Sequence, residues 1–209
     1  MTALLFYFDT IYIKLNLGDN MKAILVGVTC KHCMYKTHKR SETLIMAEFE
    51  PQLREQLLNQ TYFQIHCPQC GNLLHFQHPL CYVDKKHKFV ILMKAKEDIT
   101  EKDLQLFNDR FDMRKRLVFH YQEIAEKIRI FEQGLDDRII EKIKNNLYQR
   151  YENVEKVEFY DKDSQSDTIW FRILRGEKEE MLCVLLESYR NLVTKIDRDD
   201  MTFKEIGNH

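Results

Sequence analysis

Four of the six cysteines form two Cys-x-x-Cys pairs, Cys30–Cys33 and Cys67–Cys70, which are separated by 33 residues. Thiolates in two such pairs can surround one tetrahedral Zn²⁺ with Zn–S bonds of about 2.3 Å. In the second pair Pro68 fixes its own φ, and the following Gly71 can adopt a left-handed conformation that turns backbone N–H groups toward the sulfur atoms. The sequence therefore predicts a structural zinc site with the ligands Cys30, Cys33, Cys67 and Cys70.

These cysteines have two other conceivable uses. A thioredoxin-like redox pair begins a helix, because the helix N-terminus lowers the thiol pKa. The residues after Cys70 instead predict a strand, and those after Cys33 lack a helical apolar stripe. Two structural disulfides require an oxidising compartment, and nothing in the sequence supports export. The spacer exceeds the ~15–20 residues of common four-cysteine zinc motifs, so we expect it to contain a folded insert.

Histidines near the pairs offer a different ligand set. His32 or His66 could replace one cysteine in a Cys₃His site, but His32 lies between two ligands and is expected to face solvent. His75 and His78 differ by three positions on a predicted strand, so their side chains point to opposite faces and are not expected to share a metal.

The remaining candidate ligands have simpler explanations. Cys81 and Cys183 stand alone in apolar surroundings and are expected to be buried packing residues, with Cys81 a spare ligand at most. Asp136 and Asp137 could hold Mg²⁺ together with Glu132. Adjacent residues on a helix do not face each other, so we expect the acidic pair to cap a helix instead.

One basic and aromatic segment of the sequence could bind nucleic acid. Aromatic rings beside lysines can stack on the bases of a single strand. The same rings could instead form the small core beside the zinc site. The residues are Tyr62, Phe63, Phe76 and Tyr82, near Lys85, Lys86 and Lys88.

Composition limits the function classes. The chain has 209 residues, 44% of them hydrophobic, and a formal net charge of −1, so no overall positive field indicates nucleic acid. Residues 21–96 are basic, with 11 Lys and Arg against 5 Asp and Glu, whereas residues 97–209 are acidic. The two regions could attract each other, or the basic region could favour an acidic partner.

Nothing in the sequence predicts a membrane span or export. No stretch approaches ~20 consecutive apolar residues. The apolar start, Met1–Ile13, lacks a positive leading region and is interrupted by Asp9. Codons for Gly18 and Asp19 can carry a ribosome-binding sequence, so we expect Met21 to be the native start in a bacterium. The expected location is the cytoplasm.

Periodicity predicts an α+β fold. The N-terminal domain is a zinc-ribbon-like set of antiparallel hairpins, with strands expected over 23–29, 61–66, 73–78 and 88–94. A short inserted helix is expected over 51–59, with Pro51 at its first position. Two helices, a final helix and three antiparallel strands follow. The predicted divisions are an extension over 1–20, the zinc-ribbon-like domain over 21–97, a helical connector over 98–117, and an α+β region over 118–209.

The segments around both pairs resemble the CpXC family, which is named for paired Cys-Pro-x-Cys motifs in bacterial and archaeal proteins. The resemblance covers roughly residues 27–145 and includes 63–71, 79–84 and the stretch 126–141. Lys31 stands where the family's first motif has Pro, so that turn is less rigid. The resemblance implies zinc binding at the four cysteines, and the family's biochemical role is undefined.

The expected function is a zinc-stabilised binding module, not an enzyme. The sequence has no Gly-rich phosphate loop, Ser-His-Asp pattern or nucleophile elbow, and four cysteines leave no open position on the metal. We expect a protein partner of unknown identity, with nucleic acid the weaker alternative and no membrane. A second hypothesis is a thiol redox switch in which oxidation releases zinc.

Overall fold

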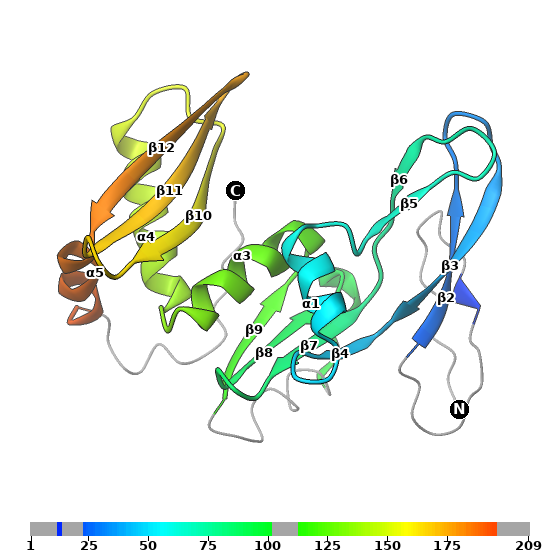
Figure 1. The fold of residues 1–209 in the computed structure, drawn as a ribbon, viewed down its shortest axis with the longest axis horizontal. Helices are drawn as coiled ribbons and strands as arrows, with labels where there is room; N and C mark the ends of the chain where they lie inside the picture. Colours follow the sequence, from blue (N-terminus) through cyan, green and yellow to red (C-terminus); the bar gives the residue numbers. More distant parts are fainter. Residues whose placement is uncertain (1–11, 14–22, 102–112, 196–209) are drawn as a thin grey trace. The chain divides into compact units, whose positions relative to one another are not determined.

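The structure, a computed structural model, describes residues 12–13, 23–101 and 113–195 (Figure 1). Helices and mostly antiparallel strands confirm the predicted α+β class. The chain divides into two compact units, residues 1–128 and 129–209. The domain limits drawn from the sequence stay a prediction. Most of the 1–20 extension, and residues 102–112 of the predicted connector, lie outside the described residues.

Two hairpins carry the cysteine pairs in the first unit. β2 (Ala23–Thr29) pairs antiparallel with β3 (Lys36–Glu42), and the short β1 (Tyr12–Ile13) pairs with the other edge of β2. β5 (Gln64–His66) and β6 (Leu73–His75) form the second hairpin. The apolar, β-branched run before the first cysteine explains β2, whose bounds agree with the sequence-based expectation.

A four-stranded sheet of mixed direction forms the rest of the strand structure in this unit. Its order is β4 (Leu44–Met46), β7 (Leu80–Asp84), β8 (Phe89–Met93) and β9 (Arg114–Val118). Only β7 and β8 are antiparallel; β4 lies parallel to β7, and β9 lies parallel to β8. The antiparallel domain predicted from the sequence did not include these parallel pairs, because each joins strands that are far apart along the chain.

Two stretches were assigned wrongly from the sequence. β7 was not predicted as a strand, although its alternating burial shows one face packed on a core. Residues 114–116 were expected to continue the helical connector but belong to β9, because pairing with β8 decides their conformation. After β8 the chain forms a 3₁₀ turn, η1 (Lys96–Asp98).

Helices supply the core of this unit. α1 (Pro51–Leu58) begins at a proline as predicted and buries Leu57. α3 (Tyr121–Glu132) crosses the boundary between the units, and its part in the first unit buries Ile124 and Ile128. Alternate residues of β7 and β8 are buried, so one face of the central sheet faces this core.

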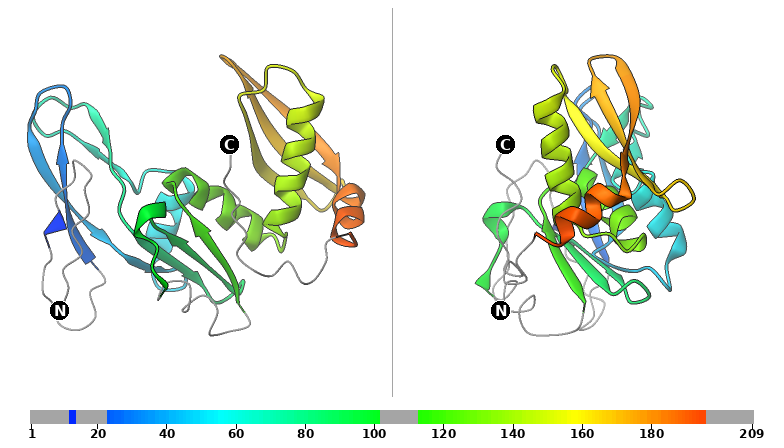
Figure 2. Two further views of the ribbon diagram at one scale, coloured as in Figure 1. Left: turned by 180° about the vertical axis from the view of Figure 1, so that it is seen from behind. Right: turned by 90° about the vertical axis from the view of Figure 1, so that its left-hand side faces the viewer.

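The second unit is a three-stranded antiparallel sheet packed on a helix. α4 (Asp137–Arg150) precedes β10 (Lys156–Asp163), β11 (Thr168–Arg175) and β12 (Lys178–Leu185), and α5 (Leu186–Val193) follows. α4 covers one face of the sheet (Figure 2). Within this unit the opposite face is left uncovered by the described helices (Figure 1).

Burial in the second unit follows the strand alternation. The covered face carries Val157, Phe159, Ile169, Phe171 and Ile173, all 1% exposed or less. The apolar stripe of α4, including Ile139, Ile140 and Ile143, is buried as well. The two sets form a continuous apolar core. No helix of the described residues is long and apolar enough to cross a membrane.

Candidate metal centre

Each cysteine pair lies in the loop of a hairpin. Residues 30–35 connect β2 to β3, and residues 67–72 connect β5 to β6. We call these loops the first and the second knuckle. Each has six residues, with cysteines at its first and fourth positions. The two hairpin tips lie side by side (Figure 1), which brings together residues that are far apart in the sequence.

The first knuckle is closed by two backbone hydrogen bonds. The N–H of Cys30 donates to the carbonyl oxygen of Tyr35 over 2.9 Å, and the N–H of Met34 donates to the carbonyl oxygen of Cys30 over 2.8 Å. Met34 has a φ of 59°, in the left-handed region that glycine adopts without strain. A non-glycine residue therefore completes this turn.

The second knuckle repeats this pattern. The N–H of Cys67 donates to the carbonyl oxygen of Asn72, and the N–H of Gly71 donates to the carbonyl oxygen of Cys67, both over 2.8 Å. Gly71 has a φ of 74°, which confirms the left-handed conformation predicted from the sequence. It occupies the position that corresponds to Met34, so the two knuckles share one backbone design.

The four sulfur atoms form one cluster. The Sγ atoms of Cys30 and Cys70 lie 3.6 Å apart, as do those of Cys33 and Cys67. All four sulfurs lie within 4.8 Å of one another. A tetrahedral metal with M–S bonds of about 2.3 Å requires S···S distances of about 3.8 Å, whereas a disulfide requires about 2.05 Å. The cluster therefore fits a metal ion, and all four cysteines are free thiols.

Backbone N–H groups surround the sulfurs. Those of Cys33 and His32 lower the pKa of the Cys30 thiol to about 6, against the effect of burial. The N–H of Tyr35 acts to lower the pKa of Cys33, but burial and the neighbouring thiols raise it to about 12. Without a metal, Cys30 and Cys33 therefore do not ionise together. A cation in the centre would remove this conflict, because it binds the thiolate forms.

The alternative ligands do not join the cluster. The sulfur cluster consists of the four paired cysteines and does not include Cys81. His32 is exposed as predicted, and His66 Nδ1 lies 3.1 Å from the carbonyl oxygen of Gly71. His75 Nδ1 lies 3.1 Å from the Tyr121 hydroxyl.

The two single cysteines differ from each other. Cys81 is partly buried and not fully buried as predicted, and this burial raises the pKa of its thiol to about 11. The prediction for Cys183 was wrong, because this residue is exposed. It lies on the uncovered face of the second unit's sheet, opposite Trp170 in the strand register.

At the start of α4, Asp136 acts as predicted, and Asp137 is the first residue of the helix. The Asp136 carboxylate accepts a hydrogen bond from the backbone N–H of Arg138 and caps the helix. It also forms an ion pair with the Arg138 guanidinium. Hydrogen bonds from Arg138 lower the pKa of Asp136, although burial acts in the opposite direction.

The aromatic residues considered for base stacking are inside the protein. Tyr62, Phe63, Phe76 and Tyr82 are all 5% exposed or less. The Phe63 ring contacts those of Tyr62 and Phe76 in edge-to-face arrangements. These rings are therefore core residues, at the base of the β5–β6 hairpin and in the central sheet, and the surface proposed for stacking on nucleic-acid bases is absent from the described residues.

A buried polar cluster that sequence reasoning missed joins the hairpins to the central sheet. The Ser41 hydroxyl lies 2.8 Å from His78 Nε2 and donates to the Tyr62 hydroxyl over 3.0 Å. Burial lowers the pKa of His78 to about 4, so the ring is neutral at neutral pH. Lys39 Nζ donates to the carbonyl oxygens of Tyr62 and Gln64, which fixes β3 against β5. No spacing in the sequence signals this cluster.

A family model described as "CpXC protein" matches residues 28–144, more than half of the chain. This chain belongs to the CpXC family. The match contains both knuckles, the central sheet and α3, so the family unit includes the whole sulfur cluster. A comparison with curated proteins found no match, and a comparison with solved structures found none either.

A hollow of about 340 Å³ lies beside the knuckles, and no acidic side chain lines it. Exposed apolar side chains occur nearby: Met34 is 70% exposed, Tyr35 43% and Leu73 45%. The lining residues are Val28, Thr29, Cys30, Lys31, His32, Asn72, Leu73, Leu74 and His75.

Proposed function

We propose that this CpXC protein is a zinc-stabilised, non-enzymatic interaction module that binds a protein partner through its knuckles. The observation that carries the proposal is the four-thiol cluster, with cross-knuckle S···S distances of 3.6 Å. Four thiolates fill the coordination shell of Zn²⁺, so no position remains for a substrate or a catalytic water. The metal would then hold the two hairpins together.

Zinc is the metal that this ligand set favours in a reducing cytoplasm, where we place the protein. Tetrahedral thiolate sites bind zinc or iron, and zinc, unlike iron, keeps one oxidation state. Structural zinc can contribute about 10 kcal/mol or more to folding. A hairpin whose strands have only three residues each, such as β5–β6, has little stability by itself, so a metal would have a large effect here.

The surface around the knuckles supports a protein partner. Met34, Tyr35 and Leu73 offer exposed apolar area, and Lys31 and His32 beside them provide positive or titratable groups. Apolar side chains bordered by basic ones suit a partner that presents an apolar anchor with acidic neighbours. This combination favours a protein over nucleic acid, because the rings that could stack on bases are buried.

The first experiment measures metal and thiols together. The full chain is purified without added metal, its metals are counted by mass spectrometry, and its cysteines are alkylated and mapped. We expect one zinc per chain and immediate labelling of Cys183, with the four knuckle cysteines labelled only after chelation or denaturation. Metal-free protein with oxidised knuckle cysteines would contradict the zinc site.

The second experiment tests the partner surface. Met34→Asn removes an exposed apolar side chain and keeps a residue that tolerates the left-handed conformation. Phe49→Asn is the matched control, because Phe49 is 73% exposed and lies outside the knuckles. Quantitative affinity purification from the native cell should lose a protein with Met34→Asn and keep it with Phe49→Asn. Identical sets of bound proteins would contradict this surface.

A thiol redox switch is the second candidate. Cys33 and Cys70 are only partly buried, and each lies 3.6 Å from a cysteine of the other knuckle. A peroxide would oxidise two such thiolates to a disulfide, be reduced to water, and release the metal. Zinc release by mild peroxide, reversed by a thiol reductant, is the expected result. Retention of zinc would exclude the switch.

A further inference from the structure

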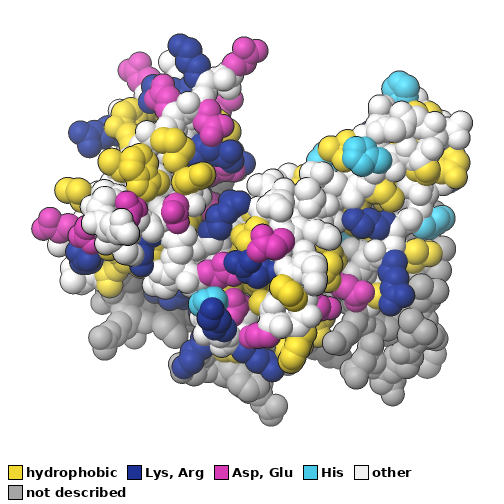
Figure 3. Space-filling view, in the orientation of Figure 1, with side chains coloured by type: hydrophobic (Ala, Val, Ile, Leu, Met, Phe, Trp, Pro, Cys, Tyr) yellow, Lys and Arg dark blue, Asp and Glu magenta, His cyan; other side chains and the backbone are white. Residues whose placement is uncertain are grey.

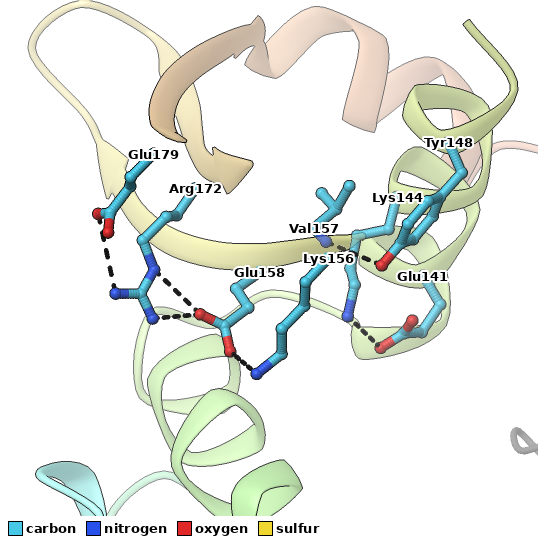
Figure 4. A network of polar contacts seen from close by, with 8 residues as sticks. All are labelled: Glu141, Lys144, Tyr148, Lys156, Val157, Glu158, Arg172 and Glu179. Carbon is cyan, nitrogen blue, oxygen red and sulfur yellow. Dashed lines mark hydrogen bonds and ion pairs between the residues drawn. The ribbon is translucent and has the colours of Figure 1, made fainter. Parts of the chain in front are cut away.

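The two edges of the second unit's sheet differ in whether side chains form hydrogen bonds to their backbone. Along β10, two N–H groups that point away from β11 have side-chain partners. The N–H of Val157 donates to the Tyr148 hydroxyl over 2.8 Å, and the N–H of Lys162 donates to Gln133 Oε1 over 2.7 Å (Figure 4 shows the first). Side chains therefore cap this edge.

The edge formed by β12 has no such capping. The N–H of Leu186 donates to the carbonyl oxygen of Asp167, which fixes which residues of β12 bond to β11. In an antiparallel ladder the bonded residues alternate with residues whose N–H and C=O point away. The outward-pointing residues are Glu179, Met181, Cys183 and Leu185. The Leu185 carbonyl oxygen accepts the first hydrogen bond of α5, because Leu185 is the N-cap of that helix. Within the described part of the chain, the other outward N–H and C=O groups have no partner.

The second half of β12 also lacks the usual features that protect an edge strand. Such strands are protected by bulges, prolines, charges or short length. β12 spans eight residues, and its register with β11 runs without a shift. The second half, 181–185, contains neither a charge nor a proline. This half can accept another strand.

The uncovered face of the sheet continues this apolar character. Side chains at Tyr160, Met181 and Leu185 are 57%, 44% and 60% exposed. Trp170 and Cys183 lie opposite each other on the same face. Apolar side chains gather over this part of the sheet in the space-filling view (Figure 3). A clustered apolar surface of this kind typically marks an interface.

We propose that β12 pairs antiparallel with β12 of a second copy of this chain and joins the two three-stranded sheets into one. The two-fold axis would pass at Leu182, so that residue 181 faces 183 of the partner and residue 179 faces 185. The four outward residues of each copy then lie in paired positions, which gives about six interchain hydrogen bonds, because the Leu185 carbonyl oxygen is already bonded within α5. This inference goes beyond the proposed function and does not depend on the metal.

The charges of β12 favour a second copy in this register. Glu179 would face Leu185 of the other copy, Glu180 would face Val184, and Lys178 would face Leu186. No like charges are opposed, which is a condition for stable cross-strand pairing. A register centred on Glu180 would oppose Glu180 with itself and leave Leu185 outside the pairing. Self-pairing also continues the apolar face from one copy to the next.

A proline substitution tests the edge. Met181→Pro removes an N–H that points away from β11, so the ladder within the chain stays intact. Sedimentation equilibrium of the full chain under reducing conditions should show a monomer–dimer equilibrium whose Kd rises at least tenfold in this variant. Cys183→Ser is the matched control and should dimerise like the wild type. Trp170 fluorescence and circular dichroism should show that both variants are folded.

Cysteine cross-linking tests the register. Paired residues have Cα atoms about 5.5 Å apart, within the range of a disulfide, so Met181→Cys should cross-link to Cys183 of the other copy under mild oxidation. Wild-type Cys183 residues would lie too far apart to link to each other. A wild-type chain that is monomeric up to high micromolar concentration overturns the proposal. A dominant Cys183–Cys183 link overturns the register.

Discussion

The two units of this protein differ in what stabilises them. In the first, two hairpins with strands of three to seven residues meet at a cluster of four thiols. In the second, three strands of eight residues pack an apolar face on α4. From this comparison we expect a metal at the cysteine cluster to take the place of apolar burial at the β5–β6 hairpin, whose strands are too short to form a core of their own.

An ion-pair network of the second unit joins side chains of its three strands. Arg172 bonds to Glu158 and lies 3.8 Å from Glu179, and Lys156 bonds to the same Glu158 carboxylate (Figure 4). Such pairs contribute little compared with the core beneath them. Substitutions that separate the metal contribution from the core contribution can therefore test the comparison.

The largest effect is expected from Cys67→Ser. This change removes one of four ligands from the buried side of the cluster, so the chain should lose its metal and about 10 kcal/mol of folding free energy in the hairpins. Metal content and hydrogen exchange of residues 23–42 and 62–78 measure the outcome. Cys183→Ser is the control, because this exposed thiol lies outside the cluster. Unchanged metal stoichiometry would refute the assignment of Cys67.

The next effect is expected from Phe171→Ala in the second unit. The Phe171 side chain is fully buried, so its truncation should cost about 3–5 kcal/mol through lost burial and the cavity left behind. The fluorescence of Trp170, the chain's single tryptophan, should report a lower melting temperature while metal content stays the same. Tyr160→Ala is the matched control at an exposed site. Loss of metal in Phe171→Ala would show that metal retention depends on this core.

A smaller effect is expected from substitutions at the left-handed position of each knuckle. Gly71→Ala should cost about 1 kcal/mol from backbone strain alone, because a Cβ there meets nothing within 4 Å. Met34→Gly relieves the same strain in the first knuckle and should stabilise it by about 0.5 kcal/mol, since the greater freedom of the unfolded chain offsets part of the gain. Competition with a zinc chelator measures both. Equal effects of the same sign would contradict the shared design.

The smallest effect concerns acid stability in the second unit. Hydrogen bonds from Lys156 and Arg172 lower the pKa of Glu158, although burial acts to raise it. A carboxylate with a lowered pKa stabilises the fold at neutral pH, and this contribution disappears as pH falls through the folded-state pKa. Glu158→Gln should therefore flatten the loss of stability below about pH 4.5, the region of an ordinary Glu. An unchanged pH profile would show that the ion pairs are energetically neutral.

Local patterns in the sequence predicted much of the fold. The β-branched run 23–29, the proline at the start of α1 and the acidic cap of α4 are each specified within a few residues, and each was predicted correctly. Errors occurred where pairing over long distances decides the conformation, as in β9 and in the parallel pair β4–β7. Cys183 was misjudged because its apolar neighbours along β12 do not reveal that one face of the strand is uncovered.

The sequence by itself determined the chemistry of the site, because only the four paired cysteines offer a complete set of soft ligands at chelating spacing. It also determined the turn at Gly71, since conformational freedom is a property of that residue. The tertiary structure alone decided that Met34 takes the equivalent left-handed position, that Ser41 and His78 share a buried cluster, and that one sheet edge is capped while the other is not. These features depend on contacts between residues distant in the chain, and such contacts leave no local pattern.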